Sequence, residues 1–413
     1  MTNNTTSSQL HFRSTTLPNG LTVVGEQRLN AVSVALGFFV RTGARDESPE
    51  VAGVSHFLEH MMFKGTAKRS ALDITYEMGA MGAQANAYTS EEATVYYMAV
   101  LPEYFRDALE LLSDMLRPSL TLEEFTVEKK VILEEIALYQ DRPTFLLFES
   151  AMNCFFGAHP AGNSVLGTTD TIGALSRDQM QTYFDARYSA SNIVLCASGN
   201  FAWEELVDLA GEYCGNWPAV EASRNRPVHV PQPAERELTK KDLQRAHLCL
   251  VGRGPSATDA ERYPLEVLGA ILGDSSGSRT YWGLVESGLA DSASIDGDDM
   301  DGAGMIYSYL SSTPELIDQA EEVLRKILRT PKEFTDDDLQ RAITKLGTRL
   351  VLQGESSMRR LMAVGLDWMY RQEYVPLAEE LARFKTVSRG SIYEALEKFP
   401  LEPTARVRMM PES

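Results

Sequence analysis

Residues 51–65 read VAGVSHFLEHMMFKG, and their apolar side chains recur at helical spacing as far as Gly65. This pattern predicts an amphipathic helix over about 51–64 that ends at the glycine. His56, Glu59 and His60 lie on one face of that helix, because residues three and four apart are neighbours. Two imidazoles one turn apart can bind one metal ion, and the carboxylate between them can reach a water beside it. A surface helix with incidental histidines is the alternative.

The order H-x-x-E-H is the inverted zinc-protease signature, and a third protein ligand would distinguish the two readings. A helix predicted over about 121–141 offers candidates. With Glu135 at 0° and steps of about 100° per residue, one stripe within about 60° contains Glu124, Glu128, Val131, Ile132, Leu138 and Tyr139. The opposite side contains Lys129, Lys130, Glu134, Gln140 and Asp141.

Three carboxylates thus lie along a stripe that we expect to face inward, where an unpaired charge costs several kcal/mol. Glu135 is the predicted third ligand, and Glu128 is a supporting acid. Glu134 is the competing ligand, although it points about 100° away. Glu124 and Glu128 pairing with arginines is the structural alternative.

The pattern on both sides of this motif predicts two α+β domains of one type. Strands are predicted over 21–27, 33–43 and 192–199, a hairpin over 84–101, and helices between them. After Pro218, Pro227, Pro231 and Pro233 the same logic repeats, with strands at 246–254 and 305–312, an acidic turn at 296–302, three long helices and a last strand at 405–410. The expected domains are 10–215 and 241–413, joined by a linker over 216–240.

The composition excludes several classes of protein. The formal charge is −19, from 39 Lys+Arg against 58 Asp+Glu, so binding to nucleic acid is not expected. An excess of acid attracts basic partners, although solubility alone could explain it. None of the four cysteines forms a C-x-x-C pair, and no apolar run reaches membrane-spanning length. The first 20 residues do not follow the secretory pattern, so a cytoplasmic location is expected.

HFLEH, followed by Glu135 in EKKVILEEI, resembles the pitrilysin-type (M16) zinc metallopeptidases. The segments LPNGLTVV at 17–24, ANAYTS at 85–90 and YSASNIVLCASGN at 188–200 also look like family segments, and the short branch with the mitochondrial processing peptidase beta subunit is the most similar. The resemblance implies two homologous domains of the LuxS/mitochondrial processing peptidase-like metallohydrolase type, each a mostly antiparallel sheet packed with helices. It also implies zinc on His56, His60 and Glu135, with Glu59 as general base and Glu128 in support.

The implied activity is that of a metalloendopeptidase acting on flexible or unfolded peptides, with some preference for basic ones. The peptide would add as a strand along 84–89, where Asn86 and Ala87 match the substrate edge of the family. Phe63 would line the pocket beside the metal, or else be an ordinary core aromatic. A non-catalytic scaffold and a zinc hydrolase of small molecules are the alternative functions.

The resemblance further implies an arginine and a tyrosine, about 13 residues apart, in the second domain. Arg279 matches the arginine, but GLADS has Asp291 where the family typically has tyrosine. Tyr281 could substitute for it. The other interpretation is a dimer, and specifically a heterodimer with a homologous subunit that carries the Arg/Tyr pair.

Overall fold

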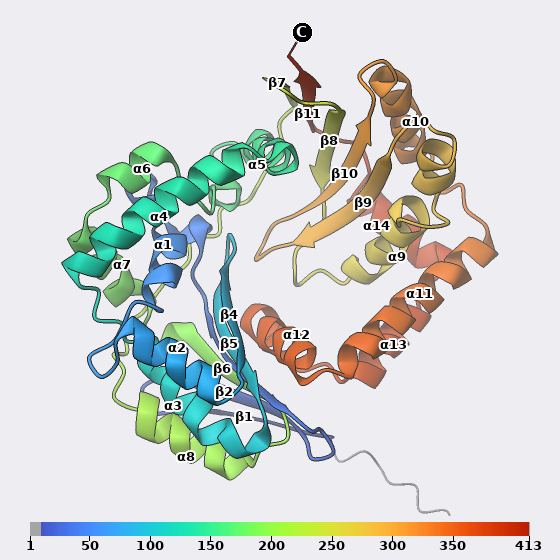
Figure 1. Cartoon of the computed structure of the whole chain (residues 1–413). Coiled ribbons are helices and arrows are strands. Elements are labelled where there is room, and N and C mark those ends of the chain that lie inside the picture. The colour runs from blue at the N-terminus through green and yellow to red at the C-terminus, as the bar shows by residue number, and fades with distance from the viewer. Residues whose placement is uncertain (1–9, 413) are drawn as a thin grey trace, which may run out of the picture. The chain divides into compact units, whose positions relative to one another are not determined.

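The computed structural model describes residues 10–412, and these form two α+β units (Figure 1). The first unit comprises the residues up to Ile136, with Asn163–Asn225 and Leu352–Val375. The second comprises Ala137–Gly162, Arg226–Val351 and the residues from Pro376 onward. Residues 1–9, on which part of the expectation about a secretory signal rests, lie outside the described range.

The first unit contains a six-stranded sheet in the order β1-β2-β6-β3-β5-β4. Its strands are β1 (Leu10–Thr16), β2 (Thr22–Arg28), β3 (Val34–Val40), β4 (Gln84–Thr89), β5 (Thr94–Val100) and β6 (Ile193–Gly199). Only β2 and β6 pair in parallel; every other neighbouring pair is antiparallel. Among residues 10–412, strand β4 therefore lies at an edge, with β5 as its one neighbour in the sheet.

The second unit contains a five-stranded sheet in the order β7-β11-β8-β10-β9. Its strands are β7 (Ala234–Lys240), β8 (Ala246–Arg253), β9 (Ser292–Asp299), β10 (Gly304–Ser312) and β11 (Ala405–Pro411). Again one pair, β7 with β11, is parallel. The order 7-11-8-10-9 matches 2-6-3-5-4 strand for strand, so the two units repeat one topology and the expected fold class is confirmed.

Helices cover both faces of the first sheet. The helices of this unit are α1 (Val54–Met61), α2 (Ala71–Ala80), α3 (Phe105–Met115), most of α4 (Leu122–Gln140), α6 (Thr169–Ala174), α7 (Arg177–Arg187), α8 (Trp203–Cys214) and α12 (Ser357–Arg371). Val24 packs with Leu361 of α12, whereas a Cβ on the next residue, Gly25, would lie 2.9 Å from the Trp203 ring of α8. Side chains of successive strand residues point to opposite faces, so α12 and α8 lie on opposite sides.

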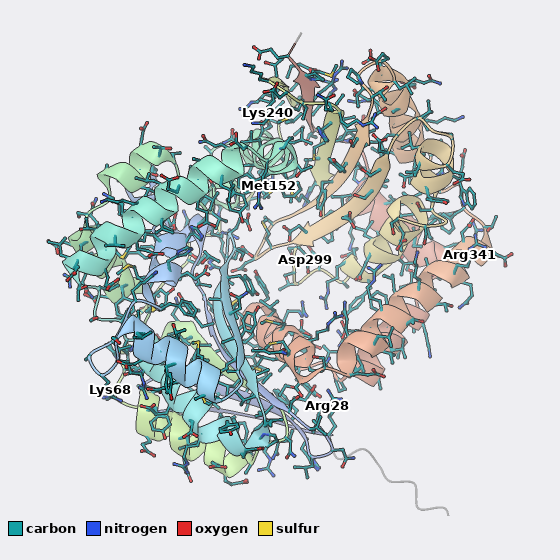
Figure 2. The ribbon with its side chains drawn as sticks, viewed as in Figure 1. Arg28, Lys68, Met152, Lys240, Asp299 and Arg341 are labelled. Carbon is teal, nitrogen blue, oxygen red and sulfur yellow. The ribbon has the colours of Figure 1, made fainter. Side chains whose placement is uncertain are left out.

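The second sheet is covered in the same way. Its unit contains α5 (Pro143–Phe156), α9 (Arg262–Gly273), α10 (Ile317–Arg329), most of α11 (Asp336–Gly354), α13 (Leu377–Lys385), α14 (Arg389–Lys398) and a π-helical turn at Tyr281–Val285. Met152 of α5, labelled in Figure 2, packs with Cys249 and Val407 on one face. Leu265 of α9 and Leu324 of α10 pack with Leu248 on the other. Each sheet is thus covered on one side by a helix from the opposite half of the sequence.

Several elements differ from the sequence predictions. β1, β7 and β9 were not predicted, and β7 lies inside the range expected to be linker. The acidic stretch predicted as a turn is largely strand β9, in which Asp296 pairs with Tyr307 of β10, and only the end of the stretch turns. Asp and Gly are rare in strands, and backbone pairing at a sheet edge overrides that preference. The three long helices predicted near the C-terminus are five, α10 to α14.

Candidate metal centre and active site

The N-terminus of α1 is held by a buried carboxyl group. Gly53, at φ 91°, precedes the helix, and a Cβ there would lie 2.6 Å from the Leu166 carbonyl oxygen. The backbone N–H groups of Gly53 and Ser55 donate to Glu47 over 2.6 and 2.7 Å. These bonds satisfy donors that a helix leaves unpaired at its first turn. Val54, Phe57, Leu58 and Met61 are buried, so the motif helix has a fixed position in its unit.

Three possible metal donors converge between α1 and α4. One donor atom each from His56, His60 and Glu135 lies within 4.8 Å of the other two. Glu135 Oε2 is 3.8 Å from His56 Nε2 and 3.5 Å from His60 Nε2. Zinc bonds of about 2.0–2.2 Å place two tetrahedral ligands roughly 3.3–3.5 Å apart. The two distances from Glu135 are close to this value, and the two imidazoles, which lie within 4.8 Å of each other, would move closer together around an ion. The structure thus brings together all three predicted ligands.

His60 is oriented by Glu128. Its Nδ1 lies 2.8 Å from Glu128 Oε1, which leaves Nε2 directed toward Glu135. Lys64 Nζ lies 2.7 Å from the other oxygen of Glu128, whose side chain is buried. Burial raises the pKa of Glu128, but the hydrogen bonds from His60 and Lys64 outweigh it and hold the pKa below its usual value. A carboxylate behind a ligand histidine fixes its tautomer and ring orientation.

His56 has the properties of a neutral ligand. Burial, and then the positive charge of His60 when it is protonated, lower the pKa of His56 to about 4. Its Nδ1 is buried and has no hydrogen-bond partner within residues 10–412, and its Nε2 points to Glu135. Metals bind the unprotonated imidazole, so this environment suits a metal ligand.

Glu59 lies between the histidines and contacts the sheet. Thr89 Oγ1, at the end of β4, donates to Glu59 Oε2 over 2.5 Å. Burial raises the pKa of Glu59, against the hydrogen bond from Thr89 and the nearby His60, which lower it. Glu59 is one residue from His60, and Thr89 binds one of its two carboxylate oxygens. The other oxygen is available to accept a proton, which is the chemistry of a general base.

The predicted substrate edge is an edge in the structure. Asn86 is exposed on β4, and its Oδ1 accepts a hydrogen bond from the Ala87 N–H over 2.9 Å. Ala87 is buried, and Phe63, just after α1, is half-buried. Their roles in binding a peptide stay predictions.

Arg279 and Asp291 belong to the second unit. Arg279 donates to the Thr330 carbonyl and hydroxyl oxygens over 2.5 and 2.8 Å. Asp291 lies 3.1 Å from Arg245, and Tyr281 donates to Glu286. The expected dimer, and a partner that carries the Arg/Tyr pair, stay predictions.

The helical wheel of α4 was partly wrong. Val131 and Leu138, expected to face inward, are 44% and 55% exposed, whereas Phe125, Ile132 and Ile136 are buried. The stripe of buried apolar residues is therefore turned by about 80° from Glu135, which lies at its border. Glu134 is exposed, and the sequence prediction preferred Glu135 over it.

Sequence reasoning missed three residues around the site: Glu47, Lys64 and Thr89. Lys64 is one turn after His60 and could have been found from that spacing. Thr89 contacts Glu59 across 30 residues of the chain, and no local pattern indicates that contact. Glu47 lies only 6 and 8 residues before its partners Gly53 and Ser55, but the loop between them has no repeating pattern that predicts the contact.

The fold and donor set define a class of protein: a metallohydrolase built from two topologically equivalent α+β units. The family profile "Insulinase (Peptidase family M16)" matches residues 22–169, and "Peptidase M16 inactive domain" matches residues 174–346. The chain belongs to peptidase family M16.

Named relatives agree with this membership. The chain is 31% identical over 380 residues to the uncharacterized zinc protease YmxG of Bacillus subtilis, covering 90% of this chain and 92% of that protein. It is 32% identical over 392 residues to an uncharacterized zinc protease of Streptomyces coelicolor, covering 92% and 85%. The crystal structure of a protease from Helicobacter pylori is similar in fold, with a TM-score of 0.90 at 19% identity over 97% of this chain and 100% of that one. Within residues 10–412, no helix is both long and apolar enough to cross a membrane.

Proposed function

We propose that the protein is a zinc-dependent endopeptidase that hydrolyses flexible or unfolded peptides. The observation that carries the proposal is the convergence of His56, His60 and Glu135, with Glu59 beside them on α1. Membership of a peptidase family, whose relatives are named zinc proteases, supports the reaction class and the metal.

His56, His60 and Glu135 would hold the zinc ion. When bound, zinc acts as a Lewis acid that lowers the pKa of a water molecule and polarises the scissile carbonyl group. Glu128 holds Nδ1 of His60, so Nε2 faces Glu135 and would be available to the ion. Glu59 accepts the proton of the attacking water and then gives it to the leaving amine, so one carboxylate acts as base and then as acid.

The edge position of β4 supports a peptide as the substrate. An extended segment can add to an unpaired strand edge through main-chain hydrogen bonds, and a flexible or unfolded chain has these groups free to pair. The same strand ends at Thr89, which contacts Glu59, so a peptide along β4 would pass close to the proposed base.

The variant Glu59→Gln tests the proposal, with Glu123→Gln on the exposed side of α4 as a matched control. Glu59→Gln should retain one zinc per chain and lose at least about 100-fold in kcat on a quenched peptide library, because the base is removed and the ligands stay. Metal analysis and the peptidase assay are run on the same samples.

The alternatives give different results in this experiment. A scaffold would bind peptides without cleaving them, and a hydrolase of small molecules would turn over ester or amide substrates but no peptide in the library. Cleavage by Glu59→Gln at the parent rate would show that Glu59 is not the base.

A further inference from the structure

Thr89 donates a hydrogen bond to Glu59, and within residues 10–412 no other strand residue does so. It is the last residue of β4, and its hydroxyl donates to Glu59 Oε2 over 2.5 Å. A hydroxyl bond to a carboxylate at this length is charge-assisted and about twice as strong as a neutral one. The glutamate has three rotatable bonds, so its carboxylate needs such a contact to keep one orientation.

The end of β4 is itself held firmly. Thr89 pairs with Thr94 across the hairpin, and Ser90 and Ala93 close the turn through a backbone bond of 2.8 Å. The turn also bonds to the loop after β3, where the Arg45 N–H donates to the Glu91 carbonyl oxygen over 2.8 Å. A buried Arg45–Glu92 ion pair adds to this attachment. A β-branched residue has few χ1 rotamers, so the backbone determines where the Thr89 hydroxyl lies.

The two partners come from different elements. Glu59 is on α1, held by its buried face and by Glu47, and Thr89 is on the sheet edge that the proposed function assigns to the peptide. The hydrogen bond therefore joins the motif helix to that edge at the position of the base. It engages Oε2 and leaves the second oxygen of the carboxylate for a proton.

From this geometry we propose that Thr89 is a positioning residue for Glu59: it holds one carboxylate oxygen so that the base stays aligned with a peptide on β4. The proposal rests on the proposed function, since it assigns Thr89 to the same reaction. Thr89 is not a metal ligand, so its hydroxyl is expected to affect turnover and not zinc binding.

Two variants of Thr89 separate the hydroxyl from the side-chain volume. Thr89→Val keeps the branched shape and removes the donor, and Thr89→Ser keeps the donor. Thr89→Val should lower kcat at least about tenfold with KM and zinc content unchanged, because a misaligned base loses rate without losing binding. Thr89→Ser should stay within about threefold of the parent.

Thr94→Val is the matched control, since Thr94 is the hairpin partner of Thr89 but donates to the Thr42 carbonyl oxygen and not to Glu59. It should lower the melting temperature and leave kcat unchanged. A readout that does not depend on activity is the crystal structure of each metal-free variant: the Glu59 carboxylate should turn away in Thr89→Val and stay in place in Thr89→Ser.

Three results would overturn the proposal: a Thr89→Val kcat within about twofold of the parent, an equal loss in Thr89→Ser, or an equal loss in Thr94→Val. A parent protein without any peptidase activity would instead overturn the proposed function, so the two failures are distinguishable.

Discussion

At the scale of single residues, the ligand set depends on which of two adjacent glutamates on α4 faces the histidines. Glu135 Oε2 lies within 3.8 Å of Nε2 of both histidines, whereas Glu134 is exposed. One residue along a helix turns a side chain by about 100°, so the neighbour cannot replace it without moving the helix.

Glu135→Gln should therefore weaken the affinity for zinc by at least about tenfold and lower the zinc content. Glu134→Gln should change both quantities little. Competition with a chromogenic chelator measures both affinities in the same buffer. A larger loss of zinc affinity in Glu134→Gln than in Glu135→Gln would identify Glu134 as the third ligand.

At the scale of elements, the motif helix depends on Glu47, which accepts N–H bonds at its first turn. The carboxyl is buried, and burial raises its pKa to about 8 against the hydrogen bonds from Ser55 and Gly53. In the unfolded chain it titrates near its ordinary value of 4.5. Between these two values the folded state holds the proton more tightly than the unfolded state.

This carboxyl should therefore make the free energy of unfolding fall as the pH rises from about 4.5 to about 8. Glu47→Gln keeps an acceptor oxygen and removes the titration. The difference in the free energy of unfolding between the parent and this variant should therefore change by an amount on the order of 3–5 kcal/mol over that pH window. Urea unfolding at a series of pH values measures it. Glu50→Gln, an exposed neighbour, is the control, and parallel curves for parent and Glu47→Gln would contradict the prediction.

At the scale of the whole molecule, the charge of −19 produces a negative field around the protein. Such a field concentrates cationic peptides and is screened by salt, with a Debye length of about 10 Å at 0.1 M.

We expect kcat/KM for a Lys/Arg-rich peptide to exceed that for a neutral peptide of equal length, and to fall as the ionic strength is raised. The neutral peptide is the internal control. Equal kcat/KM values for the two peptides at every salt concentration would show that the net charge of the protein does not contribute to specificity.

Much of the fold could be predicted because strands and helices leave local patterns. The hairpin at 84–101, the motif helix and the repetition of one layout after the prolines all follow from periodicity and turn residues. The exceptions were edge strands: β1, β7 and β9 contain many polar and charged residues. Their pairing depends on a neighbouring strand and not on their own composition.

The sequence by itself determined that His56, Glu59 and His60 share one face, because the pitch of one helix brings them together, and it favoured Glu135 over Glu134 as the third donor. That Glu135 meets the two histidines was decided by the packing of α4 beside α1. Only the tertiary structure decided the strand order, the edge position of β4, and the packing of α5 and α12 on sheets of the opposite half of the chain. It also decided that Glu47 holds the motif helix and that Thr89 holds Glu59. The physical reason is that a helix places residues three or four apart by its own geometry. A contact between residues 59 and 89 exists only after the sheet and the helix have packed.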